Sequence, residues 1–297
     1  MDTPSRHQGI SLPTATAVVV ANMIGTGVFT SLGFQVGGLP SGFAIVMLWL
    51  VGGVCAFCGA VCYGELAAAL PRSGGEYHFL SKIFHPAVGF LSGWLSVTVG
   101  FAAPIALAAM AFGKYFSAIF PHAPATTWSL VMVWIVTLIH VGGIHVAAKF
   151  QNTATWLKVL LILVFIVSGF VISEGQAVSF LPKTGDGKLV GSTPFAVSLV
   201  YVMYAYAGWN AATYIVGEIR DPQKNVPKAI ALGTLLVTVL YIALNAVFLY
   251  AAPMSELDGK LDVGHVAADR IFGHTGGQVM SGLICLGLVS SISAMTW

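Results

Sequence analysis

Long, continuous apolar stretches limit what this chain can fold into. An α-helix needs about 20 mostly apolar residues to cross a bilayer, and such stretches recur along the whole sequence. Each one is continuous, so it lacks the alternating pattern of transmembrane β-barrel strands. We therefore expect an all-α integral membrane protein with about eight transmembrane helices. The stretches lie at 12–34, 41–69, 87–119, 128–147, 153–173, 194–217, 228–251 and 277–297.

The charge content supports this class and excludes others. Hydrophobic residues make up 57% of the chain and charged residues only 8%, whereas soluble domains carry about 25% charged residues. Disorder is excluded because it requires low hydrophobicity and high charge. With 13 Lys and Arg against 11 Asp and Glu, the chain has no basic surface for nucleic acid. The expected partners are the lipid bilayer and a small molecule.

The distribution of basic residues indicates an orientation. The first ten residues are polar, and the apolar run after them is too long for a signal-peptide core. We expect a multi-pass protein of the cell (inner or plasma) membrane with a cytoplasmic N-terminus. Basic residues favour this orientation modestly, by the positive-inside rule. The inner set is Arg6, Arg72, Lys82, Lys149, Arg220, Lys224 and Lys228, and the outer set is Lys114, Lys183, Lys188, Lys260 and Arg270.

Two glycines flank Thr26 in the middle of the first stretch. Because they lack a Cβ, Gly25 and Gly27 permit a non-helical backbone. Unwound backbone within a bilayer is tolerated where it is buried in protein or lines a wet cavity. The free N–H groups that begin the following half-helix favour an anion such as a carboxylate. The alternative is a packing face of small residues against a neighbouring helix.

The sixth stretch carries aromatic residues at its centre, although aromatic residues are usually enriched at membrane interfaces. Tyr204, Tyr206 and Trp209 surround the pair Ala207 and Gly208 within residues 201–210. Such a segment could offer carbonyl groups to an ammonium group and a ring to close over a ligand. Aromatic core packing is the alternative.

Two interrupted spans in corresponding positions of two halves point to a transporter site. Stretches one and six are five helices apart, as in a five-plus-five inverted repeat. We therefore expect a single transmembrane transporter domain over 1–297, with a first repeat at about 11–174 and an incomplete second repeat at about 193–297. The eighth apolar run is still continuous at Trp297, so we expect the chain to stop within helix eight.

Five sequence motifs resemble those of the amino acid–polyamine–organocation superfamily. Residues 24–29 (IGTGVF) look like its first-helix signature, and residues 71–77 (PRSGGEY) look like its inner loop after helix two. Residues 204–210 (YAYAGWN), followed by EIRDP at 218–222 and NVPKAI at 225–230, are similar to the L-type amino acid transporter branch. These matches keep the family's order and spacing from about residue 11 to the end.

The resemblance implies a leucine-transporter-type fold that holds its substrate between helices one and six. Amides around Gly25, Thr26 and Gly27 would then bind the substrate carboxylate. Tyr204 takes the position of an aromatic gate, which is usually Phe in the L-type branch, and Ala207 stands where Gly is common. The carbonyls expected to accept from the α-ammonium are those near Met23, Ile24, Tyr204 and Ala207. The predicted substrate-binding set is Met23, Ile24, Gly25, Thr26, Gly27, Tyr204, Ala205, Ala207, Gly208 and Asn210.

Lys158 is the one basic residue well inside an apolar stretch. A cation near the bilayer centre costs about 2.5–3.5 kcal/mol on insertion scales, which makes it a functional candidate. If its helix starts near Gln151, Lys158 lies roughly 10 Å along it, and its stem could instead reach the inner interface. The resemblance implies another role, the replacement of a sodium ion that bridges helices one, five and eight. Ser290 and Ser291 would then be its hydroxyl partners, and proton coupling is conceivable.

Together these features predict a sodium-independent amino acid permease or exchanger that works by alternating access. Neutral L-amino acids are the expected substrates, because Glu65 is the only carboxylate deep in an apolar stretch. A cationic amino acid or polyamine antiporter is the alternative.

We expect no catalytic residue, no metal and no cofactor, because the sequence lacks the convergent groups that a membrane enzyme requires. Some L-type members pair with a glycoprotein through a loop cysteine; residues 118–127 contain none, so we expect no heavy-subunit partner.

Overall fold

The computed structural model describes residues 9–120, 122–260 and 262–296, and these ranges are mostly helical. They contain no strand, although one isolated parallel bridge joins Ile10 to Ile219. Arg6, which contributes to the predicted orientation, and Trp297, which ends the eighth stretch, lie outside the described residues. The all-α fold predicted from the sequence is confirmed.

Within the described residues, six helical segments are long and apolar enough to cross a membrane. Two of the eight predicted stretches form shorter helices, α7 (Ala125–Val141) and α10 (Thr193–Tyr206). A non-helical turn after Tyr206 ends α10, and a Gly142-Gly143 pair, in which Gly143 has φ of 101°, ends α7. The six segments are Leu12–Phe34, Gly42–Ala69, Pro86–Ser117, Val146–Ile172, Pro222–Ala251 and Gln278–Thr296.

Most helices follow the predicted stretches, but the boundary between the fourth and fifth stretches lies earlier than predicted. The first stretch forms α1 (Leu12–Met23), α2 (Gly27–Thr30) and η1 (Ser31–Phe34). The helix that carries Lys158 begins earlier than expected, at Ile144 instead of Gln151. The remaining long elements are α3 (Gly42–Ala69), α5 (Pro86–Leu95), the π-helical η2 (Ser96–Phe101), α6 (Ala102–Ile119), α8 (Ile144–Ile172), α11 (Pro222–Ala251) and α14 (His274–Thr296). The short elements are α4 (Gly75–Ile83), α9 (Asp186–Val190), η3 (Ala211–Glu218), α12 (Met254–Leu257) and α13 (Val263–Phe272).

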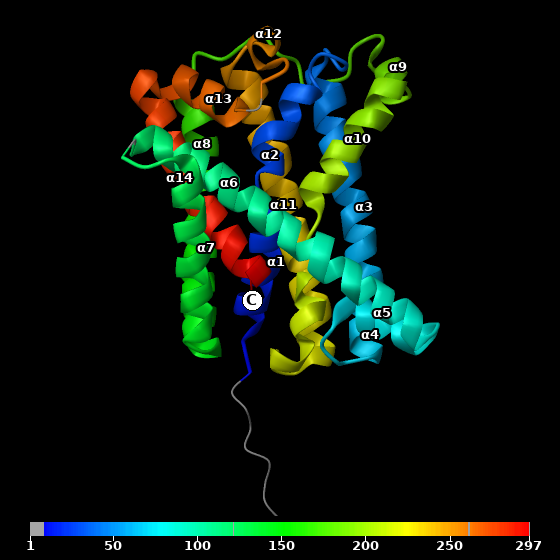
Figure 1. Cartoon of the computed structure of the whole chain (residues 1–297). Helices are drawn as coiled ribbons and strands as arrows, with labels where there is room; N and C mark the ends of the chain where they lie inside the picture. Colours follow the sequence, from blue (N-terminus) through cyan, green and yellow to red (C-terminus); the bar gives the residue numbers. More distant parts are fainter. Residues whose placement is uncertain (1–8, 121, 261, 297) are drawn as a thin grey trace, which may run out of the picture.

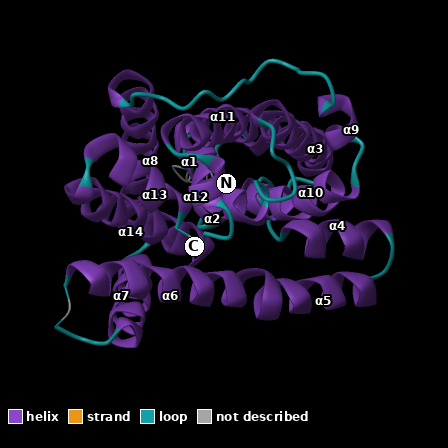
Figure 2. Cartoon of the chain, turned by 90° about the horizontal axis from the view of Figure 1, so that it is seen from above, coloured by secondary structure: helices purple, strands orange, loops and turns teal. Residues whose placement is uncertain are grey.

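The first span lies at the centre of the bundle. Figure 1 shows α1 and α2 between α14 on one side and α3 with α10 on the other. Seen from above, α5 and α6 form one long rod along the edge of the molecule (Figure 2). Most of Leu12–Phe34 is buried, whereas most of Pro86–Ser117 is exposed. The exposed side chains of this rod are largely apolar, which suits a surface that faces lipid chains.

Candidate functional site

The first span is interrupted between α1 and α2. Residues 24–26 are non-helical, and Ile24 has φ of −78° and ψ of 86°. The amide of Gly25 donates to the carbonyl of Met23 at 2.9 Å. The first amides of α2 have no partner within the helix, because every helix leaves its first N–H groups unpaired. The prediction of a break at the two glycines therefore matches the observed backbone.

A second interruption lies between α10 and η3, at residues 207–210. Gly208 has φ of +99°, and a Cβ on it would lie 2.9 Å from the backbone of Asn22. A Cβ on Gly27 would lie 2.9 Å from the Cα of Ala205. Both glycines are therefore required by the close approach of one broken span to the other, and Gly208 is required by its positive φ as well.

The two breaks share a cavity of about 180 Å³. Nine of the ten predicted substrate-binding residues line it, and Ile24 is the exception. Asn22 and Ser291 also contribute to the lining, so α1 and α14 both reach the cavity. The other lining residues are Ser96, Gly100 and Phe101 of η2, Pro104, Leu107 and Ala108 of α6, Ala211 and Tyr214 of η3, and Met295 of α14.

Lys158 lies on the other side of the first break and is buried, with 3% of its surface exposed. Its Nζ donates to the carbonyl of Ile24 at 2.8 Å, to that of Ala21 at 3.4 Å and to Ser291 Oγ at 3.1 Å. The early start of α8 at Ile144 places Lys158 about 21 Å along the helix axis at 1.5 Å per residue. Its ammonium group joins α1 to α14 instead of extending toward an interface.

The two serines proposed as partners of Lys158 have different contacts. Ser291 Oγ donates to the carbonyl of Ile24 at 2.6 Å and accepts from Lys158. Ser290 Oγ lies 3.2 Å from Thr155 Oγ1, and its carbonyl accepts from Gln151 Nε2 at 3.4 Å. The structure therefore brings Ser291, and not Ser290, to the lysine.

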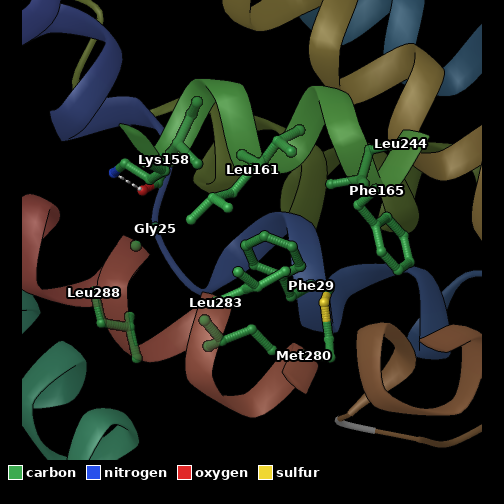
Figure 3. Close-up of a pocket in the computed structure, with 13 residues that line it drawn as sticks. Gly25, Phe29, Lys158, Leu161, Phe165, Leu244, Met280, Leu283 and Leu288 are labelled. Atoms are coloured by element: carbon green, nitrogen blue, oxygen red, sulfur yellow. Dashed lines mark hydrogen bonds between the residues drawn. The ribbon is translucent and has the colours of Figure 1, made fainter. Parts of the chain in front are cut away.

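A small apolar cavity of about 20 Å³ adjoins Lys158. Figure 3 shows the lysine at its edge, with a hydrogen bond to the unwound segment after α1, while Phe29, Leu161 and Met280 close the cavity from α2, α8 and α14. Gly25 lines both this cavity and the larger one. The unwound segment therefore separates an apolar space from a partly polar one.

Sequence reasoning missed Tyr241 of α11, which lies inside an ordinary apolar stretch. Its hydroxyl lies 2.6 Å from the carbonyl of Met23 and 3.1 Å from that of Ala205. One buried hydroxyl therefore joins the two broken spans. A polar aromatic residue within an apolar run was the only available signal.

Glu76 of α4 was not predicted from the sequence either. It accepts hydrogen bonds from Asn210 Nδ2 and from the Tyr214 hydroxyl. Glu65, the carboxylate that sequence reasoning considered instead, is exposed and lines neither cavity. Glu76 lies within the 71–77 motif, so a signal was present, but nothing in the sequence shows that α4 folds against η3.

One titratable group close to Glu76 lies outside the spanning segments. Burial of His78 in α4, together with the positive charges of Arg72 and Lys82, lowers the pKa of its imidazole below the ordinary value. The lowered pKa favours the neutral form of this imidazole near neutral pH.

A helical bundle with two broken spans that meet at a shared cavity defines the class of multi-pass membrane transporters. Residues 10–297 match the amino acid permease family, and the chain belongs to that family. The predicted resemblance to the amino acid–polyamine–organocation superfamily and its L-type branch is thereby confirmed. Family and relatives are transporters, not enzymes.

Three similar proteins illustrate the relationship. The chain is 27% identical over 275 residues to b(0,+)-type amino acid transporter 1 of Rattus norvegicus, covering 91% of this chain and 56% of that protein. It is 29% identical to large neutral amino acids transporter small subunit 2 of Oryctolagus cuniculus, covering 89% and 51%. It is 28% identical to Asc-type amino acid transporter 1 of Mus musculus, covering 89% and 52%. The chain spans about half the length of the curated relatives it matches.

Proposed function

We propose that this protein is a sodium-independent secondary transporter for neutral L-amino acids, an exchanger or permease that works by alternating access. The observation that carries the proposal is the cavity between the two breaks, with polar backbone groups from both spans on its wall. The broken spans would move against α6, α7 and α14. The two-repeat organisation, 11–174 and 193–297, is part of the same proposal and is supported by the corresponding positions of the breaks.

Carbonyl groups that already accept two hydrogen bonds are not available to a substrate, and this indicates by exclusion where each end of an amino acid would bind. A carbonyl oxygen has two lone pairs. Met23 O already accepts from Gly25 N and Tyr241, and Ile24 O from Lys158 and Ser291. We therefore place the α-ammonium at the carbonyls of the second break, near Tyr204 and Ala207. The α-carboxylate would accept from the amides of Thr26 and Gly27.

Sodium independence is supported by Lys158. Its ammonium occupies the position between α1 and α14 where a bridging cation would lie, and it bonds to Ala21, Ile24 and Ser291. A second cation there would be repelled, since like charges in a buried site disfavour one another strongly.

A neutral substrate is supported by the covered position of Glu76, whose two oxygens are bonded by Asn210 and Tyr214. One matched relative is also named for large neutral amino acids. We also propose a cell-membrane protein with a cytoplasmic N-terminus, because basic residues favour that orientation, and one that works without a heavy subunit, because residues 118–127 contain no cysteine.

Counterflow in proteoliposomes tests the proposal. The protein, expressed from its complete open reading frame, is reconstituted into vesicles preloaded with unlabelled amino acids, with sodium or potassium as the cation. We expect labelled alanine, serine or leucine to enter equally in both salts and to saturate. Entry of arginine alone would support the cationic alternative, and dependence on sodium would contradict the role of Lys158.

A pH gradient in the same vesicles tests proton coupling, and sustained single-channel currents would indicate a channel.

A further inference from the structure

Glu76 lies behind the wall of the larger cavity, in the first turn of α4. Asn210 Nδ2 donates to its Oε1, and the hydroxyl of Tyr214 donates to its Oε2. Asn210 and Tyr214 both line the cavity, whereas Glu76 does not. The carboxylate therefore acts on the cavity through these two side chains.

The hydrogen bonds of Asn210 determine which end of its amide faces the cavity. Nδ2 carries two hydrogens, one directed to Glu76 and the other to the Tyr214 hydroxyl at 3.3 Å. An ionised carboxylate only accepts hydrogen bonds, so the nitrogen end must point toward Glu76. Among the described residues, Oδ1 has no hydrogen-bond partner, which leaves this oxygen available to a ligand.

The Tyr214 hydroxyl belongs to the same network. It accepts from Asn210 and gives its only proton to Glu76. The ring is fixed edge-on against Phe101, with 5.0 Å between ring centroids. This hydroxyl therefore has no proton to offer a ligand, and the polar atom that this part of the wall presents is an acceptor.

We propose that Glu76 is a positioning residue that sets the polarity of the cavity wall, so that the transporter favours neutral amino acids whose side chain carries a hydrogen-bond donor. The proposal rests on the proposed function and names its substrate class. A site built to bond a substrate hydroxyl discriminates against an analogue that leaves the site's polar group unpaired.

Threonine and O-methylserine test this preference, because they are isomers of similar size. Threonine carries a side-chain donor, whereas O-methylserine can only accept. In the wild type we expect a higher kcat/KM for threonine. In Glu76→Gln the new carboxamide nitrogen is a donor. Facing Asn210, it makes the Asn210 amide turn over; facing Tyr214, it donates to the hydroxyl, which then turns its own proton toward the cavity. In both arrangements the cavity wall gains a donor. The threonine to O-methylserine ratio should then fall by about 5-fold or more, through KM, as expected for one exchanged hydrogen bond.

Two control variants distinguish the positioning role of Glu76 from a general effect of removing a carboxylate or of disturbing the fold. Glu76→Asp keeps an acceptor-only group, so we expect the wild-type ratio even if transport is slower. Glu65→Gln removes a carboxylate at an exposed position of α3 and should also leave the ratio unchanged. A wild-type ratio in active Glu76→Gln, or an equal loss in Glu76→Asp, would overturn the inference.

A spectroscopic measurement distinguishes failure of the positioning role of Glu76 from failure of the proposed function. If the wild type carries no amino acid, the proposed function fails, and the orientation of Asn210 is decided by NMR. Protein labelled with 15N-asparagine in lipid nanodiscs gives a side-chain amide signal for Asn210, assigned by its absence in Asn210→Ser. We expect that signal to shift in Glu76→Gln and to change little in Glu65→Gln. An unshifted signal contradicts the positioning role.

Discussion

The unwound segment between α1 and α2 has two faces that differ in how their polar groups are satisfied. Toward α8, α11 and α14, the carbonyls of Met23 and Ile24 accept from Tyr241, Lys158 and Ser291. Toward the larger cavity, the first amides of α2 have no partner within their helix. Backbone freed within a membrane must find partners elsewhere. Toward α8, α11 and α14, the protein supplies these partners. This difference supports the proposal that a substrate supplies the partners of the amides that face the larger cavity.

The largest expected effect is the loss of the lysine on the satisfied face. Lys158→Ala leaves the Ile24 carbonyl and the Ser291 hydroxyl without their charged partner. Hydrogen bonds to charged groups contribute about 1.5–3 kcal/mol, so we expect transport to fall about 10- to 100-fold while the protein stays folded. Counterflow and size-exclusion chromatography check this. Lys149→Ala, at an exposed position on the same helix, is the control, and wild-type transport in Lys158→Ala would refute the assignment.

A smaller effect is expected where the two spans touch. Gly27→Ala places a methyl group 2.9 Å from the Cα of Ala205. Overpacking of this kind typically costs about 1–3 kcal/mol, so the temperature of thermal unfolding in detergent should fall clearly. An unchanged unfolding temperature would show that the breaks separate easily.

The Tyr241 hydroxyl should contribute less, because it is neutral. Tyr241→Phe removes the bond to Met23 O and Ala205 O and keeps the ring. We expect the free energy of unfolding to decrease by about 0.5–1.5 kcal/mol, measured against Tyr201→Phe, whose ring is exposed. Equal stability of the two variants would mean that the hydroxyl does not join the spans.

The smallest effect on stability is expected on the cavity face. A Cβ on Gly25 meets no atom within 4 Å, so Gly25→Ala should leave the unfolding temperature unchanged. The methyl group would reduce the space beside the amides of α2 and raise KM about 3- to 10-fold, which corresponds to about 0.7–1.4 kcal/mol. If Gly25→Ala lowered stability as much as Gly27→Ala, the distinction between the two faces would be lost.

Local sequence patterns predicted the helices and both breaks, because apolar length and glycine placement act within one segment. The pairing of Lys158 with α1 was available only through the family resemblance. Glu76, Tyr214 and Tyr241 were missed, because their roles depend on contacts between elements more than 30 residues apart in sequence. Likewise, Ser290 and Ser291 are indistinguishable in sequence, and only the rotation of α14 decides which one reaches the lysine.

The parallel bridge at the base of the bundle has a mechanical consequence. Ile10 N donates to Glu218 O at 2.7 Å, and Arg220 N donates to Ile10 O at 3.1 Å. The broken spans are thus fastened together at their lower ends and again where Gly27 packs on Ala205. These two contacts couple the broken spans, so a displacement of one span displaces the other. In the proposed alternating access we therefore expect the two spans to tilt together against the surrounding helices.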